Sequence, residues 1–264
     1  MKCNTIVRLV MKLTLAPLVF LGLFEGSTAA QIFAPIPPVK GPTPHLEDGT
    51  VDLSGVWMGN QANSGNIAVG LKEGEVKMLP WAQEVYDHRL ANDDPEVACL
   101  PAGIPRGAPY PWRILQTPTH YFILYEGNIH SYRQIFMDGR PHPDPEDLDP
   151  TWYGHSIGHW EGDTLVVDTV GFNDRFWFDF KGHPHTEQLH TVERFTRVDL
   201  GKIEMEVLID DPGAYEEPFT TKGTARLMPP DAELMEYICQ ENNQSYGHLS
   251  GPAVTPTEGF PGLN

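Results

Sequence analysis

The hydrophobic positions of this chain change their period along the sequence. From Trp112 onward, apolar residues alternate with polar ones, which is the two-residue period of a β-strand. Turn sequences such as EGN, EGD and LGK separate nine such segments. The segments are RILQT, THYFILYEG, NIHSYRQIFMDG, YGHSIGHWEG, DTLVVDTVGF, QLHTVERFTRVD, GKIEMEVLIDD, TTKGTARLMP and AELMEYIC. With VDLSGVWMGN, where Leu53, Gly55 and Trp57 share one face, the pattern predicts about ten strands.

Short connections between these segments favour antiparallel pairing of neighbours, and a sheet of this length tends to close on itself. We therefore expect an all-β, mostly antiparallel fold, with a single closed or strongly curled barrel that is lipocalin-like in outline. One short helix is expected in LPWAQEVYDHRLAND, residues 79–93. Two long insertions, residues 139–152 and 173–187, carry aromatic, histidine and acidic residues, and we expect them to wall a site at one barrel mouth.

The first thirty residues have the layout of a secretory signal peptide. Lys2, Arg8 and Lys12 precede an apolar run that ends in small residues, with a cleavage site expected near Ala29 or Ala30. The run is too short to span a bilayer, so we expect a periplasmic or secreted protein with no membrane insertion once the signal is removed. After residues 1–30 we expect an extended lead-in over 31–50, a barrel domain over 51–243 and a loose tail over 244–264.

Charge narrows the range of partners. Without Lys2, Arg8, Lys12 and Glu25, the 18 basic and 36 acidic residues become 15 and 35, a net charge near −20. Such a charge repels phosphate backbones and anionic lipid surfaces, which argues against nucleic-acid binding. No glycine-rich phosphate loop follows any predicted strand, so a nucleotide cofactor is not expected either. We expect the partner to be a small molecule. The sequence does not indicate an oligomeric state.

Two cysteines remain once Cys3 leaves with the signal. Cysteines in an oxidising compartment often pair, and closing so long a loop would stabilise the fold by roughly 4–5 kcal/mol in the chain-entropy model. We therefore expect a Cys99–Cys239 disulfide, with two buried thiols as the alternative.

Histidines cluster in the second half of the chain, where five of the eleven fall within 36 residues. Inside a barrel, His159 or His190 would serve as a base. Asp168 or Asp174 would orient the imidazole, and Tyr153 would act as the acid, which suffices for proton abstraction and return. This set predicts a cofactor-independent lyase or isomerase. The alternation leaves open which face of the strand at 153–160 points inward.

Other residues near this cluster are candidates for binding substrate. Trp152 and Trp177 lie in the long insertions and would wall a pocket for an aromatic or glycosidic compound. His155 shares a strand face with His159, and Arg133 or Arg194 would clamp an anionic group.

A divalent metal is the alternative to a cofactor-free site. His183 and His185 form an HxH pair that puts both imidazoles on one side of an extended segment, which suits a metal-dependent hydrolase or lyase. His155 and His159 lie about 13 Å apart along a regular strand, too far to share one metal. The serine of GHSIG lacks the strand–turn–helix context of a hydrolase elbow.

Two resemblances accompany these patterns. DLSGVW is similar to the first strand of lipocalin-like barrels, which often carry a glycine, any residue and a tryptophan, here Gly55 and Trp57. The run from WYGHSIGHWEGDTLVVDTVGFND through GHPHTEQLHTVERF resembles a widespread group of uncharacterised exported bacterial proteins, over residues 50–243. The first implies a non-catalytic ligand carrier as an alternative function. The second implies export and a single domain, and it transfers no activity.

Overall fold

The computed structural model describes residues 38–60, 64–72, 74–107, 110–127, 131–239 and 241. The expected signal peptide over 1–30, the first part of the expected lead-in and the expected tail over 244–264 lie outside the described residues.

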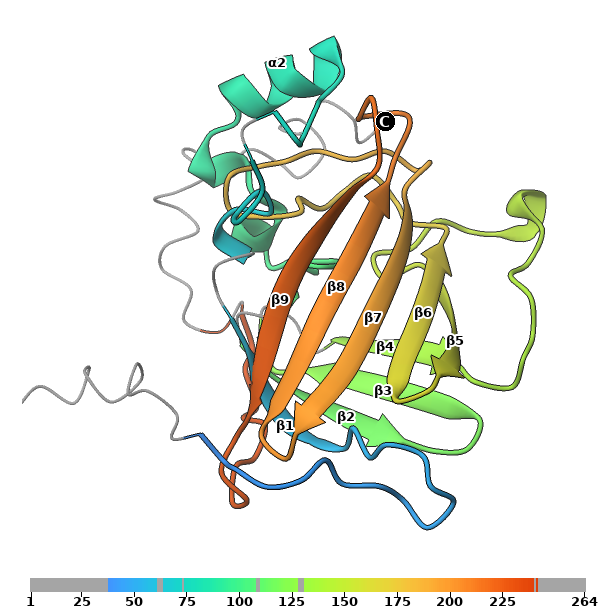
Figure 1. Ribbon diagram of the computed structural model, residues 1–264. Helices are drawn as coiled ribbons and strands as arrows, with labels where there is room; N and C mark the ends of the chain where they lie inside the picture. Colours follow the sequence, from blue (N-terminus) through green and yellow to red (C-terminus); the bar gives the residue numbers. More distant parts are fainter. Residues whose placement is uncertain are drawn as a thin grey trace, which may run out of the picture. The chain divides into compact units, whose positions relative to one another are not determined.

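Nine strands close into one barrel in the order β1 to β9, with β9 paired to β1 (Figure 1). Alternating β-branched and aromatic residues build these strands, so the expected all-β barrel is confirmed. The strands are β1 Gly55–Gly59, β2 Pro111–Gln116, β3 His120–Tyr125, β4 Ser131–Phe136, β5 His155–Glu161, β6 Thr164–Val170, β7 His190–Asp199, β8 Lys202–Asp210 and β9 Phe219–Leu227.

The helix expected over 79–93 is present as α2, Pro80–His88. Pro80 occupies the first turn, where a missing N–H costs nothing. The helix docks through Trp81, whose indole Nε1 donates to the carbonyl of Gly213 at 2.9 Å. Short 3₁₀ turns follow at η2 Ala91–Asp93, η3 Pro95–Ala98 and η4 Pro145–Asp147. No helix in the described part of the chain combines the length and apolarity needed to cross a bilayer.

One strand pair departs from the antiparallel series. β4 and β5 run parallel and pair only through Ile135 with Ser156 and Phe136 with Ile157. A parallel neighbour requires a crossover, and the insertion over 139–152 supplies it. Residues 131–134 of β4 therefore have no described strand partner on the β5 side, which opens a seam in the wall of the barrel.

The interior of the barrel is built by one face of each strand. Trp57 and Trp112 stack with ring centroids 6.4 Å apart, and Ile123, Val167 and Ile203 pack in the same cluster. A second cluster lies under the insertion over 173–187 and includes Phe172, Phe176, Phe178, Leu189 and Ile209.

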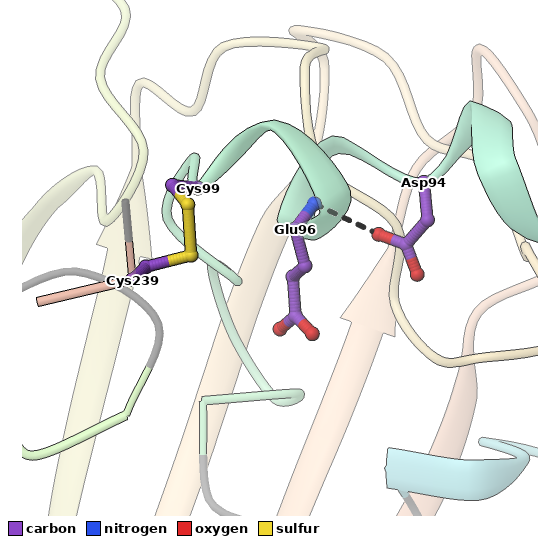
Figure 2. The surroundings of a disulfide bond; sticks show 4 residues. All are labelled: Asp94, Glu96, Cys99 and Cys239. Atoms are coloured by element: carbon purple, nitrogen blue, oxygen red, sulfur yellow. Dashed lines mark hydrogen bonds between the residues drawn. A yellow bond between two sulfur atoms is a disulfide. The ribbon is translucent and has the colours of Figure 1, made fainter. Parts of the chain in front are cut away.

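The segment over 232–239 was expected to form a tenth strand, and this expectation is wrong. It forms no strand in the structure, because its backbone bonds to side chains and not to the backbone of a neighbouring strand. The Met235 amide donates to the Glu126 carboxylate at 2.8 Å, and the Arg113 guanidinium donates to the Ala232 carbonyl at 3.4 Å. The expected Cys99–Cys239 disulfide is present (Figure 2), with the two Cα atoms 5.6 Å apart. It ties this segment to Cys99 at the end of η3. Asp94 caps the start of η3, where its side chain accepts a hydrogen bond from the Glu96 amide.

Candidate functional site

The orientation of β5 decides where the histidines lie. Ser156 is fully buried and Trp160 packs against the barrel core, whereas His159 is exposed. Placing His159 and His190 inside the barrel was therefore wrong. Small residues of β5 face inward because neighbouring side chains fill the interior beside them. A Cβ on Gly158 would lie 2.5 Å from the Met137 sulfur.

On the outer face, four polar side chains form a hydrogen-bonded chain. Nδ1 of His155 lies 2.8 Å from Nδ1 of His142, and Nε2 of His142 lies 2.9 Å from Asp168 Oδ1. Nε2 of His190 completes the chain at 3.0 Å from the same carboxylate. β5, β6 and β7 thus each contribute one member, and the crossover insertion contributes His142.

The chain fixes which ring nitrogens carry protons. The Asp168 carboxylate only accepts hydrogen bonds, so Nε2 of His142 donates to it. In the neutral ring, Nδ1 of His142 then carries a lone pair and accepts Nδ1–H from His155. Nε2 of His155 is left unprotonated, so it is the nitrogen of this ring that can accept a proton.

The surroundings of His155 keep its ring in place and neutral. Phe136 stacks on it with centroids 5.1 Å apart, and the Arg140 guanidinium sits 3.9 Å from the centroid of Phe136. Burial lowers the pKa of His155, and the neighbouring His142 and Arg140 lower it further. An imidazole with a lowered pKa is uncharged at neutral pH, as a base must be.

A groove of about 510 Å³ opens beside His155 at the β4–β5 seam. The expected acid, Tyr153, and the expected wall, Trp152, line it together with Arg133. The groove therefore brings together several residues that the sequence analysis had selected. Its other lining residues include Ser131, Tyr132, Gln134, Phe136, Leu148 and Asp149.

Tyr153 is held by two contacts. Its ring stacks on Tyr125 at 5.3 Å, and its hydroxyl lies 2.8 Å from the Ser131 hydroxyl. Burial raises the pKa of Tyr153 to about 12, so it keeps its proton at neutral pH. It can donate a hydrogen bond to a ligand oxygen, and a strongly acidic role would require a change in that environment.

Arg133 forms the inner wall of the groove, with 1% of its surface exposed. Its Nε donates to Ser156 at 3.0 Å, its Nη2 donates to Thr169 at 2.8 Å, and Nη2 also pairs with the Glu193 carboxylate. Burial lowers the pKa of Arg133, but the Glu193 carboxylate and the Tyr125 hydroxyl together more than offset this, and the net shift is upward. The positive charge next to the groove is thus permanent.

The other residues selected from the sequence lie away from the groove. His159 and Arg194 both contact the exposed carboxylate of Glu161, at 3.4 and 2.7 Å. Asp174 is exposed. Trp177 is buried, with the Arg89 guanidinium 4.5 Å from its ring centroid, so it does not wall the groove.

The two histidines of the HxH pair make different contacts. Nδ1 of His183 lies 2.6 Å from the buried Asp179 carboxylate. The ring of His185 packs between Phe176 and Phe178, and burial lowers the pKa of His185 to about 4. Among the residues that the structure describes, no group of three or more His, Cys, Asp or Glu side chains is arranged to hold a metal ion.

The sequence analysis missed two residues that the groove depends on. His142 was not selected, although it lies in an insertion expected to wall a site. Nothing in the sequence distinguishes Phe136 from the other aromatic residues in predicted strands. Only the crossover geometry, which places His142 over β5 and β6, reveals the link to Asp168.

Comparison with known proteins adds no relative: no family model, no curated protein and no solved structure matches this chain.

Proposed function

We propose that the protein is an exported enzyme that moves protons on a small, partly aromatic or glycosidic compound, as a cofactor-independent lyase or isomerase. The observation that carries the proposal is the chain from His190 through Asp168 and His142 to His155, which ends beside the groove. A second histidine and a carboxylate fix the orientation and tautomer of His155, and its lowered pKa keeps the ring in the neutral form that accepts a proton at neutral pH.

The proposed reaction begins when Nε2 of His155 takes a proton from a carbon next to a carbonyl group. The electron pair of the broken C–H bond forms a C=C double bond, the π pair of the carbonyl group moves to its oxygen, and the Tyr153 hydroxyl donates a hydrogen bond to the resulting enolate oxygen. The gained charge is shared through Nδ1 with His142 and Asp168. Protonated His155 then returns the proton to another atom, which gives isomerisation, or to a departing group, which gives elimination.

Export is part of the proposal. A disulfide between Cys99 and Cys239 is compatible with an oxidising compartment such as the periplasm or the medium. The expected signal peptide supports the same compartment. Processing of the chain near Ala29 or Ala30, read by mass spectrometry of the exported protein, would test it.

The proposal is tested by solvent hydrogen exchange. Small aromatic and sugar carbonyl compounds are incubated with the protein in D₂O, and deuterium incorporated next to the carbonyl is followed by NMR. We expect wild-type protein to catalyse exchange and His155→Gln to lose it. His159→Gln is the matched control, since His159 lies on the same strand face but contacts only the exposed Glu161 among its described polar partners.

Other outcomes point elsewhere. Loss of exchange in His159→Gln but not in His155→Gln would return the base to the residue chosen from the sequence. Exchange that survives both changes and requires an added divalent metal would favour the alternative at His183 and His185. No exchange by wild-type protein with any compound would reject the proposal.

A further inference from the structure

A second cavity lies inside the barrel, and Arg133 lines both this cavity and the groove. It offers about 60 Å³, and Ile123, Phe195 and Val207 give it apolar walls. Residues of the connection between β1 and β2, such as Ile104 and Pro105, line it too. By its volume it holds a few heavy atoms of a ligand, so a larger molecule would extend toward this connection.

Two buried hydrogen-bond donors belong to residues that line this cavity. The indole Nε1 of Trp112 and the Nη1 of Arg133 are both inaccessible to solvent, and neither makes a hydrogen bond of good geometry in the described residues, although the Tyr125 hydroxyl that also lines the cavity interacts with the Arg133 guanidinium. Trp112 is 3% exposed and Arg133 is 1% exposed. A buried N–H without an acceptor is unfavourable, so an acceptor supplied by a ligand would remove that cost.

The charge of the cavity selects the kind of acceptor. Glu193 also lines the cavity and pairs with Arg133, so the two charges offset one another. A carboxylate ligand would meet the Glu193 charge in an apolar enclosure, which is unfavourable. A neutral oxygen meets no such repulsion and accepts from both kinds of N–H.

We propose that this cavity binds a small neutral carbonyl compound whose oxygen accepts hydrogen bonds from Trp112 Nε1 and Arg133 Nη1. The site is distinct from the groove, because Arg133 is the residue that their linings have in common. It therefore does not depend on the chemistry proposed for His155, and each site can fail without the other.

The test is calorimetric titration of the full exported protein with butanone and cyclohexanone. Cyclohexanecarboxylate serves as the anionic control and benzene as the control without an acceptor. We expect saturable binding of the ketones that exceeds binding of both controls. Trp112→Phe keeps the aromatic wall and removes the N–H, so ketone affinity should fall about three- to tenfold, the worth of one hydrogen bond.

A second variant keeps the test decisive if Trp112→Phe does not fold. Met205 lines the cavity and is only partly buried, and Met205→Phe should fill the space and abolish ketone binding. His155→Gln should leave ketone binding unchanged, although it abolishes exchange in the groove. Absence of saturable ketone binding, equal binding of benzene, tighter binding of the carboxylate, or unaltered affinity in Met205→Phe would each overturn the proposal.

Discussion

Two groups of histidines in this barrel each contact an aspartate, and they differ in what surrounds them. Asp179 is fully buried and accepts from three backbone amides as well as from His183, so that group holds a loop together. Asp168 is partly exposed and contacts only His142 and His190 among its described side-chain partners. An Asp–His contact is therefore a candidate for chemistry only where its chain of contacts ends beside a groove, as it does at His155.

Asp168→Asn should produce the largest effect, and on activity alone. The asparagine amide can donate to Nε2 of His142 as well as accept from it. The proton positions in both rings are then no longer fixed, and Nε2 of His155 is not kept unprotonated. We expect the rate of deuterium exchange to fall about 10²- to 10⁴-fold. Because the Asp168 side chain is 35% exposed, the free energy of unfolding should change by less than about 1 kcal/mol. Initial exchange rates and urea midpoints measured on the same preparation check both parts.

Asp179→Asn is the same substitution in the other group and should do the reverse. The amide nitrogen would face N–H donors that the carboxylate now satisfies, from Ile67, Gly182 and His183. We expect the free energy of unfolding to drop by roughly 3 kcal/mol, with exchange per folded molecule unaltered. Asp174→Asn, at an exposed position of the same insertion, is the control and should lie within about 0.5 kcal/mol of wild type. Equal urea midpoints for the two variants would show that the Asp179 network is not structural.

Local pattern was sufficient to predict the barrel, the helix at Pro80–His88 and the disulfide, since alternation, helical spacing and cysteine count are properties of short segments or of composition. It misled at 232–239, where the apolar residues are those of a strand but no neighbouring strand is available to pair with them. Strand pairing is a property of the whole sheet, and one segment cannot reveal it.

The candidate site was only partly predictable for the same reason. Asp168 and His190 were selected together, and they do contact each other. The inward face of β5 was not predictable, because Gly158 and Ser156 accommodate Met137 and Arg133, which reach β5 from the other side of the 139–152 crossover. The role of His142 likewise follows from the parallel β4–β5 crossover. Contacts of this kind depend on register between segments, which periodicity does not contain.

Burial of His185 should make the free energy of unfolding depend on pH. Its pKa is about 4 in the folded protein and near 6.5 without burial, so the unfolded chain binds more protons between these values. Its contribution to stability is complete above about pH 6.5 and is lost as the pH falls through about 4, at most roughly 3 kcal/mol. His185→Leu should flatten the dependence of the free energy of unfolding on pH over this window. Urea titrations at several pH values measure the slope, and an unchanged slope would contradict the assignment.

The smallest effect is expected from His142→Gln, and it tests whether the chain of contacts on the outer face exists in solution. Burial lowers the pKa of His155 most, and His142 and Arg140 lower it further, so replacing the His142 imidazole should raise that pKa. The NMR titration of the His155 ring measures it. Arg140→Gln should shift the pKa in the same direction, because Arg140 also acts on His155 through its charge. His159→Gln should leave it unmoved, since the charge of His159 is not among those that act on His155. An equal pKa of His155 in His142→Gln and in wild type would show that His142 does not connect His155 to Asp168 in solution. His155 would then be an ordinary surface histidine.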